Sequence, residues 1–402
     1  MTNKALLALI TIVLLSCPRQ PPADMEESAL TQDIVIDLAP EEDNIVYETE
    51  DLAVMEDNLV IIAVGDNLYH NVMIRSGERG NYGAAHIEIE PLVKNADIAF
   101  INQETLLGGI EFGFTGYPLF NSPQGVGKAI SEAGFNVINH ANNHVMDKGE
   151  RAVFATMDFW DTIPEAQILG IHRSQEERNT PLIVEKNNLK IGFLAYTYGT
   201  NGLPIPQDKA YLVSLINMEI MEAEISALRP LCDLLIVSMH WGSEYQHITS
   251  NRQRELAAFL AEHNVDLIFG HHPHVIQPVE YILRPDGSFM LCFFSLGNFI
   301  SAQATPPTML GAMAYIKIRR VPAQNEGERD SFIFVDDGVI PLVTHYERGW
   351  TNFKIYPLYS YSEESSKRHW INRESMVMTI DYLEDLAERL LGFRKIKQNP
   401  FY

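Results

Sequence analysis

The chain has 402 residues and carries 53 acidic against 30 basic side chains, which gives a formal net charge of -23 with neutral histidines. So acidic a chain is a poor general partner for nucleic acids and for anionic lipid headgroups, because like charges repel. We therefore expect no nucleic-acid partner, and any hold on a polyanion must be local or depend on a bound cation.

Residues 1–17 have the features of an export signal. Lys4 precedes an apolar run that ends at Leu15, and a small residue precedes Cys17. The run is too short to span a membrane. The sequence Leu-Leu-Ser-Cys resembles the lipobox of bacterial lipoproteins, so we expect a lipid on Cys17 and a protein anchored to a membrane outside the cytoplasm, with a plain cleaved signal as the alternative.

Residues 18–57 are predicted to form an acidic, disordered tether. The stretch 24–57 contains 13 acidic residues and no Lys or Arg, and self-repulsion keeps such a segment extended and solvated. The tether carries a large part of the net charge, so the remainder of the chain is less acidic than the total.

Six apolar runs beyond the tether are predicted to be strands, and each ends in a polar side chain. The runs and the residues at their ends are 58–66 with Asp66, 96–104 with Glu104, 135–144 with Asn143 and His144, 232–240 with His240, 265–274 with His271, His272 and His274, and 291–299 with Asn298.

Helical segments lie between these strands. Residues 123–134, 149–163 and 250–264 have apolar spacing near 3.6 and end at Gly, Asn or Pro. Strand and helix in repeated alternation predict an α/β fold, in which ligands bind beyond the carboxyl ends of the strands. The polar residues at the strand ends are therefore expected to meet in one crevice.

The last part of the chain, 346–402, is aromatic and irregular, and then shows a strong amphipathic helix over 374–395. We interpret this helix as packing on the main domain, because its polar face mixes charges instead of being basic. Cys232 and Cys292 lie in apolar, strand-like runs and are interpreted as buried thiols, although a disulfide is permitted outside the cytoplasm.

The strand ends supply carboxylate, amide and imidazole groups without a thiolate. Such donors suit one or two ions of Mn, Fe, Zn or Mg. Two ions about 3.5–4 Å apart need a bridging carboxylate and are suited to attack on phosphorus. The alternative is a satisfied polar network, which is improbable for five strand ends that converge on one crevice.

The motifs VGDNL, INQET, INHANNHVMDKG, MHWGSEY, GHHPHVIQPVE and FSLGNFI resemble, in order, those of the CapA family of bacterial capsule or poly-γ-glutamate synthesis proteins, within the calcineurin-like metallophosphatase superfamily. The resemblance implies a four-layer αββα metallophosphatase-like sandwich over 58–345, followed by the C-terminal extension 346–402.

The resemblance also implies a division of roles among the site residues. One metal ion would be held by Asp66, Glu104 and His274, and a second by Glu104, Asn143, His240 and His272. His144 would stay free to donate a proton to the leaving group. The first motif usually reads Asp-x-His and the bridging residue is usually Asp, whereas this chain has Leu68 and Glu104 at these positions. His70 could replace the missing histidine, and His271 is expected to cap the turn or pack.

Four further residues are predicted to support these groups or to contact substrate. Asp147 could orient His144 by accepting a hydrogen bond. Glu244 and Tyr245 follow a predicted ligand and are expected to line the pocket. Asn298 could either contact substrate or support a ligand.

Two functions are consistent with these features. The first is a metal-dependent hydrolase of capsule or poly-γ-glutamate synthesis, in which metal-activated water attacks a phosphoester or a γ-glutamyl amide. The second is a non-catalytic component that binds or exports an anionic polymer through its metals, together with Arg75, Arg79, Arg252 and Arg254. Capsule-synthesis membrane proteins are the expected protein partners. A serine hydrolase is disfavoured, because the chain has no Gly-x-Ser-x-Gly motif.

Overall fold

The computed structural model describes residues 58–78, 81–322, 331–391 and 396–401. The predicted signal and the predicted tether lie outside these residues. None of the helices in the described part of the chain combines the length and apolar character needed to cross a membrane.

Two β-sheets form the centre of the molecule. The first sheet has the order β14 (Thr351–Pro357), β13 (Ser331–Glu347), β12 (Leu310–Val321), β1 (Asn58–Asn67), β2 (Ile98–Gln103), β3 (Val137–Asn139) and β4 (Gln167–Leu169), and β11 (Asn298–Ile300) pairs with β1. The second has the order β5 (Leu182–Lys186), β6 (Leu189–Thr197), β7 (Leu234–His240), β8 (Leu267–His271), β10 (Phe289–Phe293) and β9 (Val279–Leu283).

The side chains of β1 show how the layers arise. Ile61 and Ala63 belong to a core between the two sheets, whereas Ile62 and Val64 belong to a core on the other face of the first sheet. Successive side chains of a strand point to opposite faces, so an uninterrupted apolar strand must be covered on both sides. The apolar run from Leu59 to Val64 therefore requires a buried position in the middle of a sandwich.

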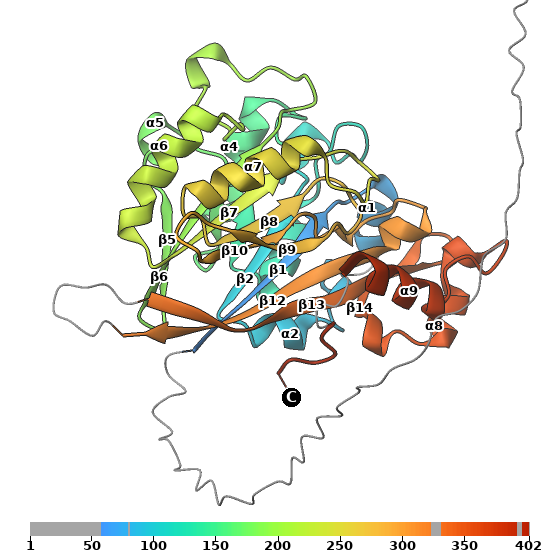
Figure 1. Cartoon of the computed structure of the whole chain (residues 1–402). Coiled ribbons are helices and arrows are strands. Elements are labelled where there is room, and N and C mark those ends of the chain that lie inside the picture. The colour runs from blue at the N-terminus through green and yellow to red at the C-terminus, as the bar shows by residue number, and fades with distance from the viewer. Residues whose placement is uncertain (1–57, 79–80, 323–330, 392–395, 402) are drawn as a thin grey trace, which may run out of the picture. The chain divides into compact units, whose positions relative to one another are not determined.

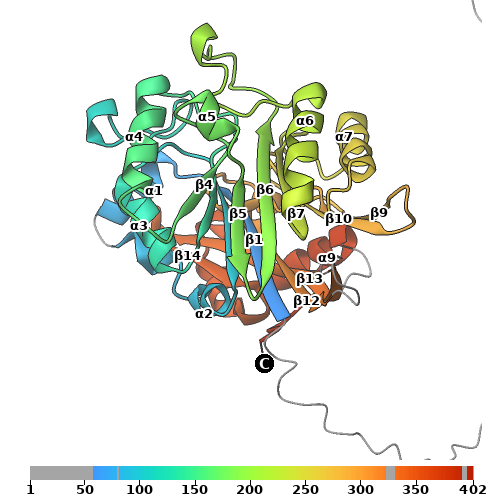
Figure 2. The same cartoon turned by 90° about the vertical axis from the view of Figure 1, so that its left-hand side faces the viewer.

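Helices cover the two outer faces, as Figure 2 shows. Helices α1 (Asn71–Glu78), α3 (Gln124–Glu132) and α4 (Glu150–Trp160) lie on the first sheet, and α6 (Met218–Leu228) and α7 (Asn251–Glu262) lie on the second. The short helices are α2 (Glu90–Lys94), α5 (Gln175–Arg178) and α8 (Glu363–Arg368). The predicted four-layer αββα sandwich is thus confirmed, and the three helices predicted over 123–134, 149–163 and 250–264 are present.

The end of the chain packs on the same core. Helix α9 (Ile380–Leu391), drawn in dark red in Figure 1, contributes Leu383, Leu386 and Leu391 to the cluster between the sheets. The predicted contact with the main domain is confirmed. The helix begins at Ile380 and not at 374, and residues 392–395 lie outside the described residues.

The single strand predicted over 291–299 is wrong. Residues Phe289–Phe293 form β10 in the second sheet, and Asn298–Ile300 form β11 in the first. The chain turns between them at Gly297, whose φ of 63° is easily adopted by glycine. This crossing places Asn298 beside Asp66 in the first sheet. Cys232 and Cys292 are both buried free thiols, as interpreted from the sequence.

Candidate metal centre

Strands of both sheets deliver the candidate ligands to one place. Asp66 lies at the carboxyl end of β1, and Glu104 directly follows β2. From the second sheet, His240 ends β7, while His272 and His274 follow β8. All five side chains are buried. The sequence places these residues up to about two hundred positions apart, and the paired sheets bring them together.

The first candidate group consists of Asp66, Glu104 and His274. One donor atom of each residue lies within 4.8 Å of the donor atoms of the others. Asp66 Oδ2 and His274 Nδ1 are 3.0 Å apart, and Glu104 Oε1 lies 3.9 Å from His274 Nε2. These are the three residues expected at the first metal.

The second candidate group consists of Glu104, His240 and His272, with donor atoms again within 4.8 Å of one another. Glu104 Oε1 lies 3.6 Å from His240 Nε2. Asn143 Oδ1 is 2.8 Å from the same nitrogen, so its amide oxygen also faces this group. Glu104 is therefore common to both groups, as a bridging carboxylate must be.

The hydrogen bonding around Glu104 fits a divalent cation. Both of its carboxylate oxygens are buried without a hydrogen-bond partner among the described residues, and so are Nδ1 of His240 and Nδ1 of His272. Buried polar atoms are nearly always paired, and an isolated buried carboxylate is costly. Nitrogen and oxygen donors of this kind suit Mn, Fe, Zn or Mg, so the residues present fit such an ion.

Burial and neighbouring charges shift the pKa values of the site residues. Burial, followed by the charge of Asp66, raises the pKa of Glu104 well above its usual value. Burial would also raise the pKa of Asp66, but the hydrogen bond and charge of His274 together with the charge of His271 hold it below its usual value. Burial lowers the pKa of His272 to about 3, which keeps the imidazole neutral and able to ligate.

Two of the histidines have an unusual backbone conformation. The φ angles of His272 and His274 are 96° and 59°, in a region that side chains other than glycine rarely adopt. Such conformations cost free energy and persist where the surrounding structure enforces them, often at functional sites. Here they turn both imidazoles toward the carboxylates of the first sheet.

His144 and Asp147 form a hydrogen-bonded pair beside the two groups. His144 Nδ1 lies 2.8 Å from Asp147 Oδ2, and both side chains are buried. The same carboxylate oxygen accepts a hydrogen bond of 2.6 Å from Phe120 N, which fixes its position. With Nδ1–H donating to Asp147, Nε2 of His144 is left for proton transfer. The predicted orientation of His144 by Asp147 matches this contact.

The other predicted residues have different surroundings. Glu244 is exposed, and its negative charge contributes to the raised pKa of Glu104. The ring centroid of Tyr245 lies 6.0 Å from that of His274. Asn298 is buried and donates to Gln303 Oε1 at 2.9 Å, so it supports the following loop.

Three positions near the ends of β1 and β8 bear on the unusual first motif. Leu68 is buried and provides no ligand. His70 Nδ1 lies 3.2 Å from Leu68 O, and His70 belongs to neither candidate group among the described residues. His271 stacks on Phe100 with centroids 5.8 Å apart, as a packing residue does, while its Nδ1 lies 3.7 Å from Asp66 Oδ1.

Sequence analysis missed the residues that follow β6. Asn201 Oδ1 accepts a hydrogen bond of 3.1 Å from Asn143 Nδ2, and its Nδ2 lies 3.4 Å from His144 Nδ1. The ring of Tyr198 lies 4.7 Å from that of His272. A usable signal was present, because the run LKIGFLAYT ends in a polar residue like the other strands and is followed by Tyr-Gly-Thr-Asn-Gly.

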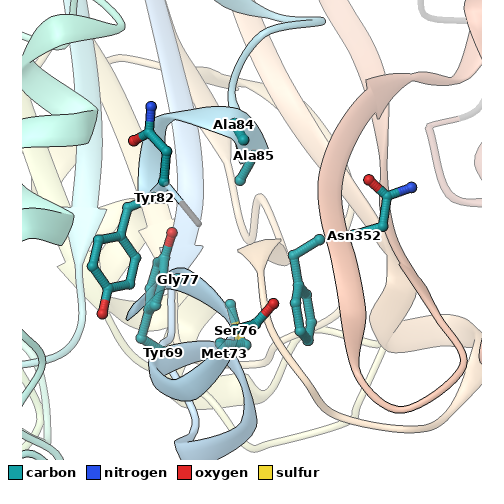
Figure 3. A pocket seen from close by; sticks show the side chains of 10 residues that line it. Tyr69, Met73, Ser76, Gly77, Tyr82, Ala84, Ala85 and Asn352 are labelled. Atoms are coloured by element: carbon teal, nitrogen blue, oxygen red, sulfur yellow. The ribbon is translucent and has the colours of Figure 1, made fainter. Parts of the chain in front are cut away.

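A pocket elsewhere on the molecule has a different chemistry. Its volume is about 190 Å³, and it lies between α1, residues 81–85 and β14, where Tyr69, Tyr82 and Asn352 are among the residues that line it (Figure 3). No carboxylate and no imidazole lines it. We therefore place the candidate metal centre at the strand ends and not in this pocket.

A two-sheet αββα sandwich with Asp, Glu and His gathered at its strand ends defines an α/β protein with a candidate metal site. Residues 60–303 match the family described as bacterial capsule synthesis protein PGA_cap, and the chain belongs to this family. The resemblance to CapA proteins noted in the motifs is confirmed.

Two relatives carry the CapA name. The PGA biosynthesis protein CapA of Bacillus subtilis (strain 168) is 29% identical over 194 residues, which cover 48% of this chain and 50% of that protein. The capsule biosynthesis protein CapA of Bacillus anthracis is 30% identical over 199 residues, 48% of this chain and 46% of that protein. The match thus spans about half the length of each relative.

Solved structures with a related chain path include nucleotidases. NAD nucleotidase (NadN) of Haemophilus influenzae has a TM-score of 0.44 and 11% identity, over 72% of this chain and 52% of that one. A 5'-nucleotidase precursor of Thermus thermophilus has a TM-score of 0.42 and 12% identity, over 71% and 54%. Likeness at this level carries no information about the activity of the present chain.

Proposed function

We propose that this chain is a metal-dependent hydrolase of capsule or poly-γ-glutamate synthesis that cleaves a phosphoester or a γ-glutamyl amide. The observation that carries the proposal is the buried carboxylate of Glu104, which has no hydrogen-bond partner among the described residues and faces one imidazole of each candidate group. A structural polar network would satisfy such a carboxylate with hydrogen bonds.

The proposed roles follow from the positions of the side chains. Asp66, Glu104 and His274 would hold one ion, and Glu104, Asn143, His240 and His272 a second. Divalent ions in such a site supply Lewis acidity and activate water as a nucleophile. His144, oriented by Asp147, would donate a proton from Nε2 to the leaving group.

Replacing His144 with Gln tests the hydrolase. We expect turnover of bis(p-nitrophenyl) phosphate or of γ-glutamyl-p-nitroanilide by the Mn²⁺-loaded protein to fall by about 10²–10⁴-fold, because that is the usual contribution of a general acid. Metal content, measured by mass spectrometry of the digested protein, should be unchanged. The two substrates distinguish the two bond types.

The matched control is His263→Gln. His263 precedes β8, at the end of that strand opposite to the candidate metal centre. Its Nδ1 contacts Phe259 O in its own helix, and its Nε2 lies 3.7 Å from the exposed Glu222 of α6. It should keep full activity. Wild-type protein that binds metal but turns over neither substrate would contradict the hydrolase proposal.

The N-terminal segment would anchor this hydrolase to a membrane outside the cytoplasm through a lipid on Cys17. The support is the lipobox-like sequence described above. We expect full-length protein expressed in a lipoprotein-processing bacterium to enter the detergent phase of a Triton X-114 separation, and the Cys17→Ser variant to move to the aqueous phase. Equal partition of the two proteins would contradict the anchor.

The alternative, a non-catalytic component that binds or exports an anionic polymer, finds less support in two of the four arginines named for it, and a third, Arg79, lies outside the described residues. Arg254 is engaged with Glu280 at 3.0 Å, and Arg252 pairs with Glu255 at 2.7 Å. Cations that already have carboxylate partners offset little of the repulsion between an acidic protein and a polyanion.

A further inference from the structure

Two tyrosines flank the candidate metal centre, one beside each group. Tyr198 follows β6, and its ring lies 4.7 Å from that of His272 and stacks nearly parallel to that of His240. Tyr245 follows β7, and its ring lies 6.0 Å from that of His274. About half of each side chain is exposed, 49% for Tyr198 and 51% for Tyr245. We call these two residues the tyrosine pair.

The backbone holds both members of the tyrosine pair against the segments that carry the candidate ligands. Tyr198 N donates to His240 O at 3.0 Å, and Tyr245 N donates to Pro273 O, between the two histidines, at 2.8 Å. The φ of Tyr245 is 61°, a conformation that costs free energy for a bulky residue. These contacts fix the Cα positions from which both rings extend beside the candidate ligands.

The hydroxyl groups are also fixed. Tyr198 Oη donates to Asn201 Oδ1 at 3.4 Å, and Tyr245 Oη accepts from Gln303 Nε2 at 3.2 Å. A tyrosine phenol is uncharged at neutral pH. The pair therefore offers two neutral aromatic faces beside the metal centre.

The charges around the site restrict the ligand further. The ion-pair partners of Asp66 and Glu104 among the described residues are all histidines. Glu244 is exposed, and its negative charge acts on Glu104 and on both tyrosines. This carboxylate would repel a ligand with many negative charges. A single anionic group can be neutralised by the metals while the rest of the ligand stays uncharged.

From these observations we propose that the tyrosine pair binds an uncharged ring of the substrate, whose single phosphoryl group reaches the metal centre. Aromatic faces bind flat rings by stacking, and this contact depends little on which ring is bound or on its charge. The inference rests on the proposed function and specifies its substrate class as a ring-bearing phosphoester instead of a polyanionic peptide. Two biological sources supply an uncharged ring: nucleosides carry a flat aromatic base, and sugars carry a saturated ring whose C–H face packs on aromatic side chains.

The experiment compares two phosphonates that share the anionic group and differ in the ring. With Mn²⁺-loaded wild-type protein, calorimetry should give phenylphosphonate about 10-fold tighter binding than methylphosphonate. In the double variant Tyr198→Ala/Tyr245→Ala this preference should disappear, while the affinity for methylphosphonate and the metal content stay the same. The control Tyr359→Ala removes another exposed tyrosine, with 41% exposure, and should keep the preference.

The outcomes separate this inference from the function on which it rests. Equal binding of the two phosphonates by wild type, or a preference that survives in the double variant, would overturn the role of the tyrosine pair and leave the metal site intact. Tri-γ-glutamate that bound more tightly than phenylphosphonate through the same tyrosines would overturn the substrate class. Wild-type protein that bound no divalent ion would contradict the proposed metal-dependent hydrolase itself.

A last comparison distinguishes the sources of the ring. Adenosine 5'-monophosphate and glucose 1-phosphate are titrated into the Mn²⁺-loaded His144→Gln protein, in which hydrolysis is suppressed. Tighter binding of either than of methylphosphonate, lost in the tyrosine double variant, supports the inference and identifies the ring. If neither adenosine 5'-monophosphate nor glucose 1-phosphate binds more tightly than methylphosphonate, the inference is contradicted.

Discussion

Replacing Glu104 with Gln is expected to abolish tight binding of divalent ions at both candidate groups. The carboxylate of Glu104 lies between His240 and His274, and Glu104 is the one residue that the two groups share. An amide keeps the shape but loses the charge and one anionic oxygen. Since even supporting residues around a metal change affinity by about 10–100-fold, we expect the loss of this bridge to weaken binding by at least about 100-fold.

The same substitution should act in opposite directions on stability with and without metal. Ions that bind only the folded protein stabilise it by about 2.7 kcal/mol at a concentration 100 times Kd, and Glu104→Gln protein should lose this gain. Without metal, wild type retains a buried carboxylate that lacks a hydrogen-bond partner, so the variant should be equally stable or more stable. Urea unfolding with Mn²⁺ and with EDTA measures both effects.

The pH dependence of the stability of the metal-free protein tests the raised pKa of Glu104. Burial raises its pKa in the folded protein above the usual 4.5, so the folded state binds more protons than the unfolded state above that pH. Buried histidines with lowered pKa values, such as His272, make the free energy of unfolding rise with pH up to about their usual 6.5 in both proteins. The Glu104 contribution is therefore measured as a difference: the free energy of unfolding of metal-free wild type minus that of Glu104→Gln should fall as the pH rises above 4.5. Asp66, whose pKa is lowered, contributes below its usual 3.8 and stays outside this window.

Glu132→Gln is the matched control, because Glu132 is an exposed residue at the end of α3. It should leave metal affinity and stability unchanged. Glu104→Gln protein that kept a full metal-induced stabilisation would show that Glu104 does not bridge, and would contradict the whole assignment of the two groups.

The layers of the fold and the set of residues that meet at the metal centre could be predicted from local patterns. An apolar run such as 58–66 must be buried on both faces, and parallel strands place their carboxyl ends along one edge. The spacing of polar residues after such runs therefore indicated Asp66, Glu104 and His240 without knowledge of any contact. The structure adds that both carboxylates come from the first sheet and that the imidazoles of the two groups come from the second.

Three features could not be predicted in this way. The run 291–299 is apolar throughout, so its hydrophobicity hides the change of sheet at Gly297. The contact of Asn201 with Asn143 and His144 joins positions 57 and 58 residues apart, and no local period reports such pairing. Strands β12, β13 and β14 complete the first sheet from the C-terminal side, and their pairing with β1 is set by long-range packing.

Replacing Gly65 with Ala is expected to destabilise the protein and displace Asp66. A Cβ added at Gly65 would lie 1.8 Å from Gly297 O, and 3.1 Å from Leu296 C, so the obstacle is backbone that cannot turn away. Asp66 N donates to the same Gly297 O at 2.9 Å, which fixes the carboxylate beside His274. Overpacking of this kind costs about 3 kcal/mol, and the shift of β1 should weaken metal binding as well.

Gly199→Ala provides the control for the glycine itself, because no atom lies within 4 Å of an added Cβ and its φ is outside the left-handed region. It should change the free energy of unfolding by less than about 0.5 kcal/mol. Urea unfolding and Mn²⁺ titration of both variants measure the two effects. Gly65→Ala protein that was as stable as Gly199→Ala and bound Mn²⁺ with wild-type affinity would contradict this prediction. The close approach of β1 to Gly297 would then not be what positions Asp66 for metal binding.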